Sequence, residues 1–303
     1  MTFNEWLQIS TKKLAEKNIS SARLDCLIIL ELVLKIDRTK ILAELNTELE
    51  IKQILLLNQF LNTRIKQTPI AYLTKKVEFY GRDFYVDQRV LIPRPESELI
   101  VELAKQLVIN LNKPIQNTHN SLSIKTSPNE YKAINKYLEK TTSNGIIQLA
   151  DVGCGSGNLG ISISLELPKT TVDLIDNSLP ALQVTKINVA KYSTDNLVIE
   201  SYLLNNTSKD YQIIIANLPY VPDDFPISES AKFEPKHALY AGNDGLKYYR
   251  ELFNQLSEIK IKPLYIIIEK MPILDTRLAE LTKHSSYKTI LTSRYVNAYQ
   301  LML

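Results

Sequence analysis

The apolar positions of residues 2–66 recur at the three- and four-residue spacing that places side chains on one face of an α-helix. Thr2 and Glu5 stand three positions apart at the start of this region, which is the spacing of a capping box at a helix amino terminus. Residues 1–68 are therefore predicted to form a small helical domain.

The pattern changes at Thr68, where the chain continues as TPIAYLTKKVEFYGRDFYVDQRVLIPRPE and becomes rich in aromatic and β-branched residues. Such residues favour strands, and Gly81 supplies a turn between two of them. Residues 69–96 are predicted to form a β-hairpin linker that ends at the prolines of LIPRPE. Helical spacing then returns in SELIVELAKQLV, with Ser97 as the expected cap.

Residues 110–145 are dominated by Asn, Ser, Thr and Lys, a composition that buries little apolar surface. They are predicted to be a flexible insertion with one short helix around Tyr131 to Lys140. Beyond them, apolar runs alternate with helix-length segments: IIQLADVG, TVDLID, LVIESYL, YQIIIAN and PLYIIIE. This alternation predicts βαβ units and a parallel sheet, so residues 97–303 are expected to form one α/β domain around the insertion.

Three glycines, Gly153, Gly155 and Gly157, stand between a predicted strand and a predicted helix. Glycines there allow a tight turn and let backbone amides approach a ligand at the helix amino terminus. A purely structural turn is the simplest alternative. Gly155, Gly157 and Gly160 also satisfy the dinucleotide pattern G-x-G-x-x-G, and Asp176 ends the next strand where a ribose-binding acid belongs. The loop alone therefore fits a nicotinamide cofactor as well as S-adenosylmethionine.

The stretch IIIANLPYVP carries a polar turn directly after a buried strand. Such a turn suits methylation of an amide or an exocyclic amine, because the lone pair of that nitrogen is delocalised. The Asn217 side-chain oxygen and the Leu218 carbonyl would hold the two N–H bonds and direct the lone pair at a sulfonium methyl group. Pro219 stiffens the turn, and Tyr220 offers a flat face for stacking. An ordinary turn after a buried strand is the alternative.

The NLPY turn distinguishes between a nicotinamide cofactor and S-adenosylmethionine. A nicotinamide enzyme has no use for an Asn-x-Pro-Tyr turn at the end of this strand, whereas amino and amide methyltransferases use one. Asp151, just before the glycine loop, favours the same conclusion, because its carboxylate can organise the loop and the ammonium group of S-adenosylmethionine. S-adenosylmethionine is therefore the predicted cofactor.

Composition narrows the range of partners. The chain has 36 Lys and Arg against 33 Asp and Glu, a net charge of +3 that gives no electrostatic case for a duplex binder. Cys26 and Cys154 are far apart and the 3 histidines share no ligand spacing, so neither a metal site nor a disulfide is predicted. The amino terminus has no signal-peptide pattern and no apolar run reaches membrane-spanning length, so a cytoplasmic protein away from the membrane is expected. Nothing in the sequence suggests an obligate interface, so a monomer is expected.

Several of these stretches resemble the peptide chain release factor glutamine methyltransferases: TPIAYLTKKVEFYG with LIPRPESEL, DVGCGSG, VDLIDNSLPAL, IIIANLPYV and FEPKHALYAGNDGLKYYREL. The resemblance runs from about Thr68 to Arg250, interrupted by residues 110–145, and LIPRPESEL and FEPKHAL are not general methyltransferase signals. It implies a helical amino-terminal domain, a hairpin linker and a Rossmann-like, seven-stranded S-adenosylmethionine-dependent methyltransferase sheet. It also implies the substrate of this family, the glutamine side chain in the Gly-Gly-Gln loop of release factors, which is methylated on its amide nitrogen. The implied process is translation termination, in which release factors act.

The resemblance implies a role for each matching position. The cofactor-binding set comprises Asp151, Gly153, Cys154, Gly155, Ser156, Gly157, Asp176, Tyr202 and Asn217. Within it, Asp176 would take the ribose and Tyr202 would lie near the adenine. The glutamine amide would be held by the turn Asn217, Leu218, Pro219 and Tyr220. Arg94 and Glu96 would support the wall of the active site and the linker.

The chain departs from the family at a few positions. Leu218 replaces the first of two prolines, and Ser201 stands where an acid usually meets the adenine amine. IIIEKMPIL lacks the glycine that commonly follows the acid of that strand, and the terminal SRYVNAYQLML matches poorly. These departures predict altered adenine recognition and altered substrate docking.

Two other functions compete with this one. Leu218 brings NLPY close to the turn of ribosomal-RNA adenine methyltransferases, and Leu218 with Ser201 suits a non-catalytic relative that only binds S-adenosylmethionine. A base substrate would predict a basic groove with stacking aromatic residues, and no Lys or Arg cluster lies beside NLPY. A release factor is therefore the expected partner, without direct contact to nucleic acid.

Overall fold

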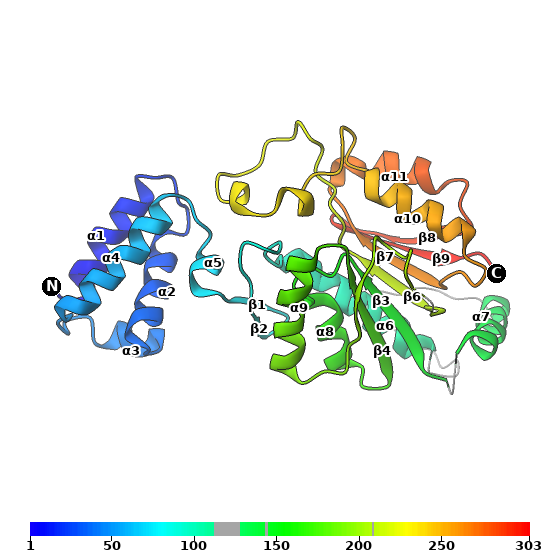
Figure 1. The fold of residues 1–303 in the computed structure, drawn as a ribbon, viewed down its shortest axis with the longest axis horizontal. Coiled ribbons are helices and arrows are strands. Elements are labelled where there is room, and N and C mark those ends of the chain that lie inside the picture. Colours follow the sequence, from blue (N-terminus) through cyan, green and yellow to red (C-terminus); the bar gives the residue numbers. More distant parts are fainter. Residues whose placement is uncertain (112–127, 143–144, 208) are drawn as a thin grey trace. The chain divides into compact units, whose positions relative to one another are not determined.

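The computed structural model describes residues 1–111, 128–142, 145–207 and 209–303 (Figure 1). Its contacts divide the chain into two compact units. The first, which we call the helical unit, comprises Met1–Lys76 and Ile227–Phe233. The second, the sheet unit, comprises Val77–Pro226 and Glu234–Leu303. Each unit has its own apolar core.

The helical unit is built from short helices, as the apolar spacing predicts. They are α1 (Phe3–Ala15), α2 (Ala22–Leu34), α3 (Arg38–Ala43), α4 (Ile51–Ile65) and α5 (Ile70–Thr74). The capping box at the start of α1 is present, because the Glu5 amide donates to Thr2 Oγ1 at 3.2 Å and the Thr2 amide donates to Glu5 Oε2 at 2.8 Å. Trp6 lies in the core of this unit and donates from Nε1 to Asn58 Oδ1 at 3.1 Å. Helix α5 lies within the segment predicted as a hairpin linker, and the contact division places the boundary after it, at Lys76.

A buried ion pair joins two helices of this unit. Arg64 Nε of α4 lies 2.7 Å from Asp25 Oδ2 of α2, and the two side chains are 7% and 1% exposed. Arg64 also donates from Nη1 to the Thr68 carbonyl at 3.2 Å. A buried charge without its counterion is strongly unfavourable, so this pair sets how α2 and α4 pack against each other.

The sheet unit contains the predicted parallel strands. They are β3 (Ile147–Val152), β4 (Thr170–Asp176), β5 (Val198–Glu200), β6 (Ile213–Ala216) and β7 (Tyr265–Glu269), followed by β8 (Tyr287–Thr292) and β9 (Val296–Leu301). Together they form a seven-stranded sheet in the order β5-β4-β3-β6-β7-β9-β8. Strand β9 runs opposite to the other six strands, which all point in the same direction. The α/β, Rossmann-like methyltransferase sheet implied by the resemblance is thus confirmed.

The strand order positions the site. The chain passes from β3 outward through β4 to β5, and then returns to the other side of β3 as β6. A crevice forms at the carboxyl ends of parallel strands where the order reverses in this way, so the loops after β3, β4 and β6 meet there. The helices that flank the sheet are α6 (Glu98–Leu111), α7 (Pro128–Thr141), α8 (Asn158–Glu166), α9 (Leu179–Tyr192), α10 (Lys247–Glu258) and α11 (Asp275–Thr282) (Figure 1).

Helix α7 contains the short helix predicted at Tyr131 to Lys140. Its Ile134 is buried in the core of the sheet unit, and its Tyr137 hydroxyl donates to the Lys262 carbonyl at 2.5 Å. This part of the predicted insertion therefore packs against the unit. The flexibility predicted for 112–127 and 143–144 lies outside the described residues.

A two-stranded hairpin, β1 (Val77–Phe79) and β2 (Arg82–Phe84), opens the sheet unit. The Tyr80 amide at its turn donates to Glu98 Oε1 of α6 at 2.8 Å. Arg82 Nη2 donates to Glu166 Oε1 of α8 at 2.6 Å. These contacts hold the hairpin to two helices of the sheet unit. Among the helices described, none is both long enough and apolar enough to cross a membrane.

The buried ion pair generates a prediction for stability. Asp25→Ala should destabilise the helical unit by about 3–5 kcal/mol, because the Arg64 guanidinium would lose its buried counterion. The chain has 1 tryptophan, Trp6, which lies in the core of the helical unit. Urea unfolding followed by Trp6 fluorescence therefore reports on the unfolding of that core.

Glu31→Ala is the matched control for this measurement. Glu31 pairs with Arg38 at 2.8 Å, but their side chains are 28% and 41% exposed. Its removal should change the unfolding free energy by about 0–1 kcal/mol. Equal effects of the two substitutions would contradict the role given to the buried pair.

Candidate active site

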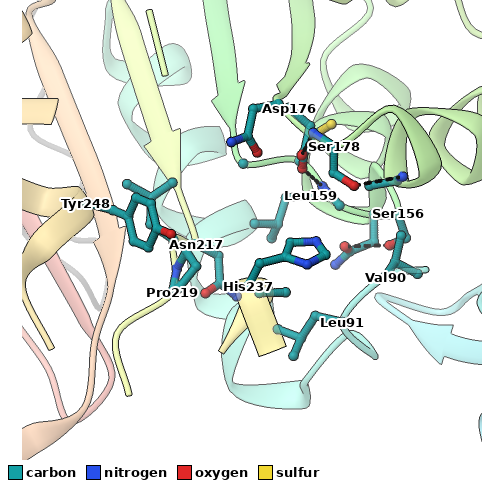
Figure 2. Close-up of a pocket in the computed structure, with 18 of the residues that line it drawn as sticks. Val90, Leu91, Ser156, Leu159, Asp176, Ser178, Asn217, Pro219, His237 and Tyr248 are labelled. Carbon is teal, nitrogen blue, oxygen red and sulfur yellow. Dashed lines mark hydrogen bonds between the residues drawn. The ribbon is translucent and has the colours of Figure 1, made fainter. Parts of the chain in front are cut away.

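A cavity of about 340 Å³ lies at the carboxyl ends of β3, β4 and β6 (Figure 2). The predicted residues that line it are Gly153, Cys154, Gly155, Ser156, Asp176, Tyr202, Asn217, Leu218 and Pro219. In Figure 2, Asp176 and Ser178 lie on one side, Asn217 and Pro219 on another, and His237 reaches between them. The structure thus brings the glycine loop and the NLPY turn into one cavity.

The glycine loop is anchored to the neighbouring strand. The amides of Gly153 and Cys154 both donate to the Ile175 carbonyl of β4, at 2.8 and 2.9 Å. Gly153 and Gly157 have φ values of +76° and +79°, in the left-handed region that glycine adopts without strain. The loop therefore turns sharply out of β3 and enters α8 at Gly157.

Gly153 also lies against the NLPY turn. A Cβ atom placed on Gly153 would lie 2.8 Å from Leu218 Cδ2, which is too close for an unstrained contact. Leu218 is only 3% exposed, so its side chain fills the space next to the glycine. The leucine that replaces the family's proline is thus a packing residue between the glycine loop and the turn.

Asp176, the last residue of β4, binds the glycine loop through its side chain. Its Oδ2 accepts a hydrogen bond from the Gly155 amide at 2.9 Å, and its Oδ1 accepts one from the Ser178 amide at 2.8 Å. Burial raises the pKa of the Asp176 carboxyl, and these backbone hydrogen bonds oppose the rise. The side chain lines the cavity at the position where a ribose acceptor was predicted.

Asp151 lies behind the loop. It is fully buried, and its Oδ2 accepts from the Gly160 amide of α8 at 2.9 Å. Burial raises the pKa of its carboxyl to about 7; the Gly160 hydrogen bond opposes the rise, and the nearby charge of Asp176 adds to it. Asp151 is not among the residues described as lining the cavity. Its observed contact is with the helix that follows the loop.

The NLPY turn follows β6, whose residues are all buried. Asn217 Nδ2 donates to Ser97 Oγ at 3.3 Å, and the Ser97 hydroxyl donates to Glu269 Oε2 at the end of β7. The Tyr220 hydroxyl donates to Glu269 Oε1 at 2.9 Å. Asn217, Ser97, Glu269 and Tyr220 thus form one hydrogen-bonded group, which we call the Glu269 network.

The sequence pattern predicts Ser97 only as a helix cap and indicates no role for Glu269. The available signal was that Glu269 ends a buried strand next to β6, as Asp176 does next to β3. The aromatic residue that lines the cavity near the turn is Tyr248 of α10, while the Tyr220 hydroxyl is bound to Glu269. Neither Tyr248 nor His237 was predicted.

Arg94 joins two loops that border the cavity. Its Nη2 lies 2.6 Å from Oε1 of Glu234, and the Ile92 amide donates to Glu234 Oε2 at 3.0 Å. Glu234 is buried and belongs to FEPKHAL, whereas Arg94 belongs to LIPRPE. Both stretches contribute cavity residues, and this ion pair joins them. Glu96 is exposed on the same stretch.

Tyr202 lines the cavity, and its hydroxyl donates to Glu251 of α10. The hydroxyl of Ser201 accepts from the Asn206 amide at 3.0 Å, so it is used by the turn that follows β5. Within the described ranges, no group of three or more His, Cys, Asp or Glu side chains could hold a metal ion.

The residues present fit S-adenosylmethionine. Gly155 lines the cavity, and a Cβ atom on it would meet nothing within 4 Å, so the loop leaves open space for a ligand. Asp176 offers carboxylate oxygens for ribose hydroxyls, and Tyr202 and Tyr248 offer ring faces. The polar and apolar groups thus lie in one cavity that suits a nucleoside with an amino-acid tail.

Comparisons with known proteins show which families and relatives this chain is similar to. Residues 5–74 match the family described as PrmC N-terminal domain, and residues 132–226 match the methyltransferase small domain. The chain is 28% identical over 292 residues to a release factor glutamine methyltransferase of Coxiella burnetii, covering 93% of this chain and 94% of that protein. It is 31% identical over 249 residues to a bifunctional methyltransferase of Rickettsia typhi, covering 80% of this chain but only 45% of that protein. The solved N-terminal domain of human METTL16 in complex with SAH is 12% identical, with a TM-score of 0.46, and covers 74% of this chain and 77% of that one.

The sheet, the cavity at its carboxyl edge and the methyltransferase match define an S-adenosylmethionine-dependent methyltransferase. The resemblance to the release factor glutamine methyltransferases is confirmed as well, by the match of residues 5–74 and by curated relatives over most of the chain.

The contact between Gly153 and Leu218 can be tested by substitution. Gly153→Ala should weaken binding of S-adenosylhomocysteine, measured by calorimetry, by more than about tenfold, because the new methyl group would displace Leu218 and distort the loop. Leu218→Ala in the same chain should recover part of this loss.

Gly242→Ala is the matched control. Gly242 has a φ of +78°, but a Cβ atom there would lie 3.8 Å from Lys247 Cβ, an ordinary contact. This substitution carries the same backbone strain, about 1–2 kcal/mol, without the close approach. If both alanine variants bound the ligand equally well, the proposed contact would be unimportant for the cofactor loop.

Proposed function

We propose that this chain methylates the side-chain amide nitrogen of the glutamine in the Gly-Gly-Gln loop of peptide chain release factors. The observation that carries the proposal is the placement of Asn217, Leu218 and Pro219 on the cavity that the glycine loop lines. The names of the relatives that match over most of the chain support the same substrate. The release factor is accordingly the proposed protein partner.

The chemistry explains why such a turn is needed. An amide nitrogen is a poor nucleophile, because its lone pair is shared with the carbonyl. When bound, S-adenosylmethionine supplies an electrophilic methyl group. The protein holds the two N–H bonds of the glutamine amide with the Asn217 side-chain oxygen and the Leu218 carbonyl, which orients the nitrogen. A strong general base is not required, since the N–H becomes acidic as the methyl group arrives.

The cofactor roles follow from the same arrangement. Gly153 to Gly157 would surround the amino-acid and ribose portion, and Asp176 would accept from the ribose hydroxyls. Tyr202 would lie near the adenine. The Ser201 hydroxyl lines the cavity and accepts from the Asn206 amide, which leaves one of its lone pairs to accept from the adenine amine.

Transfer of labelled methyl to a purified bacterial release factor tests the proposal. Label should appear on the factor and be absent from a variant whose loop reads Gly-Gly-Ala, because the alanine has no amide nitrogen. Absence of label from both proteins, with cofactor binding confirmed separately, would contradict the proposal. Label on ribosomal RNA in a parallel reaction would then favour the adenine methyltransferase alternative.

Asn217→Ala tests the role of the turn. The substitution should abolish methyl transfer, to below about a hundredth of the wild-type kcat, because the acceptor that orients the nitrogen is removed. Calorimetry should find S-adenosylhomocysteine affinity within about threefold of wild type, since the glycine loop and Asp176 are unchanged. An equal loss of kcat and cofactor affinity would refute the role assigned to Asn217.

A further inference from the structure

The Glu269 network connects the Asn217 amide to a buried carboxylate. Glu269 is 0% exposed at the end of β7. Its two carboxylate oxygens accept from the hydroxyls of Ser97 and Tyr220, and Ser97 Oγ in turn accepts from Asn217 Nδ2 at 3.3 Å. Asn217 therefore lies between the cavity that it lines and a group that can only accept hydrogen bonds.

The directions of these hydrogen bonds follow from the chemistry of the groups. Burial raises the pKa of the Glu269 carboxyl, and the hydrogen bonds from Ser97 and Tyr220 oppose that rise. In its ionised form the carboxylate has no proton to donate, so the one proton of the Ser97 hydroxyl goes to Glu269. Ser97 Oγ then has only lone pairs to offer to Asn217. The end of the Asn217 amide that faces Ser97 must therefore be its NH₂ group.

The opposite orientation of the amide is disfavoured. With Asn217 Oδ1 against Ser97 Oγ, the single hydroxyl proton would have to serve both Asn217 and Glu269. One buried oxygen would then lack a donor, and a buried acceptor without a partner is unfavourable.

We infer that Ser97 and Glu269 are positioning residues, which hold the Asn217 amide with its nitrogen on the network and its oxygen toward the cavity. The value of this orientation for catalysis rests on the function proposed above. The nitrogen of a glutamine amide presents N–H donors, so Asn217 can hold that nitrogen only through its oxygen. Without the network, the side-chain amide of Asn217 could flip and present its own NH₂ group to the substrate.

The first test needs no substrate. In protein labelled with ¹⁵N at asparagine, the side-chain NH₂ signal of Asn217 is identified as the one missing from Asn217→Ala. Its exchange with solvent should be at least about tenfold faster in Ser97→Ala than in wild type, because the acceptor is lost. Ser97→Thr, which keeps the hydroxyl, should restore slow exchange. Unchanged exchange in Ser97→Ala would overturn the inference.

The second test separates positioning from folding by kinetics on the release factor. Ser97→Ala should lower kcat by about 10- to 100-fold, with KM and the Kd of S-adenosylhomocysteine within about threefold of wild type. Glu269→Gln should also lower kcat, because a carboxamide can donate to Ser97 and free its proton for Asn217 Oδ1. Ser97→Thr should return kcat to within about threefold of wild type.

Ser162→Ala is the matched control for both tests. Ser162 of α8 is also fully buried, and its Oγ has no hydrogen-bond partner among the residues that the structure describes. It should match wild type in kcat and in Asn217 exchange. Parallel losses of kcat and cofactor affinity in Ser97→Ala, not repaired by threonine, would show a merely structural role and overturn the inference. A wild-type protein that does not label the release factor would instead contradict the proposed function, and the exchange measurement would still decide the role of Ser97.

Discussion

The carboxylate of Glu269 is buried at the carboxyl end of β7. Its hydrogen bonds determine how the NLPY turn, the part of the cavity proposed to hold the substrate amide, is built. A buried charge is tolerated only where donors satisfy it, and here the donors come from separate elements. Ser97 precedes α6 and Tyr220 follows β6, while the Tyr249 hydroxyl of α10 donates to the Glu269 carbonyl. The LIPRPES loop, the NLPY turn and α10 are therefore anchored at one point.

The glycine loop, the part of the cavity proposed to hold the cofactor, depends on a different constraint. The chain turns sharply as it leaves β3. Two amides of the glycine loop share the Ile175 carbonyl, and a third, that of Gly155, binds the Asp176 carboxylate. The two sides meet where Leu218 packs against Gly153. Because this contact has no free space, a change in the glycine loop is transmitted to the turn that would hold the substrate.

Much of this site could be predicted, because it is built at strand ends. Asp176 and Asn217 each follow an apolar run, and parallel strands bring their carboxyl ends to one edge of a sheet. The seven-stranded fold followed from the same runs together with the resemblance. The observed bond of the Tyr220 hydroxyl to Glu269 and the position of Tyr248 on the cavity could not be predicted, because they depend on how α10 packs near the turn.

The five parallel strands, the glycine loop and the polar turn could be predicted from sequence patterns, since each depends on residues close together along the chain. The groups that complete them are brought into contact by the fold. Arg94 and Glu234 are 140 residues apart, and Ser97 and Glu269 are 172 apart, so no local pattern pairs them. Their pairing follows from burial, because a charged or hydroxyl group removed from water takes the partner that the fold places within reach.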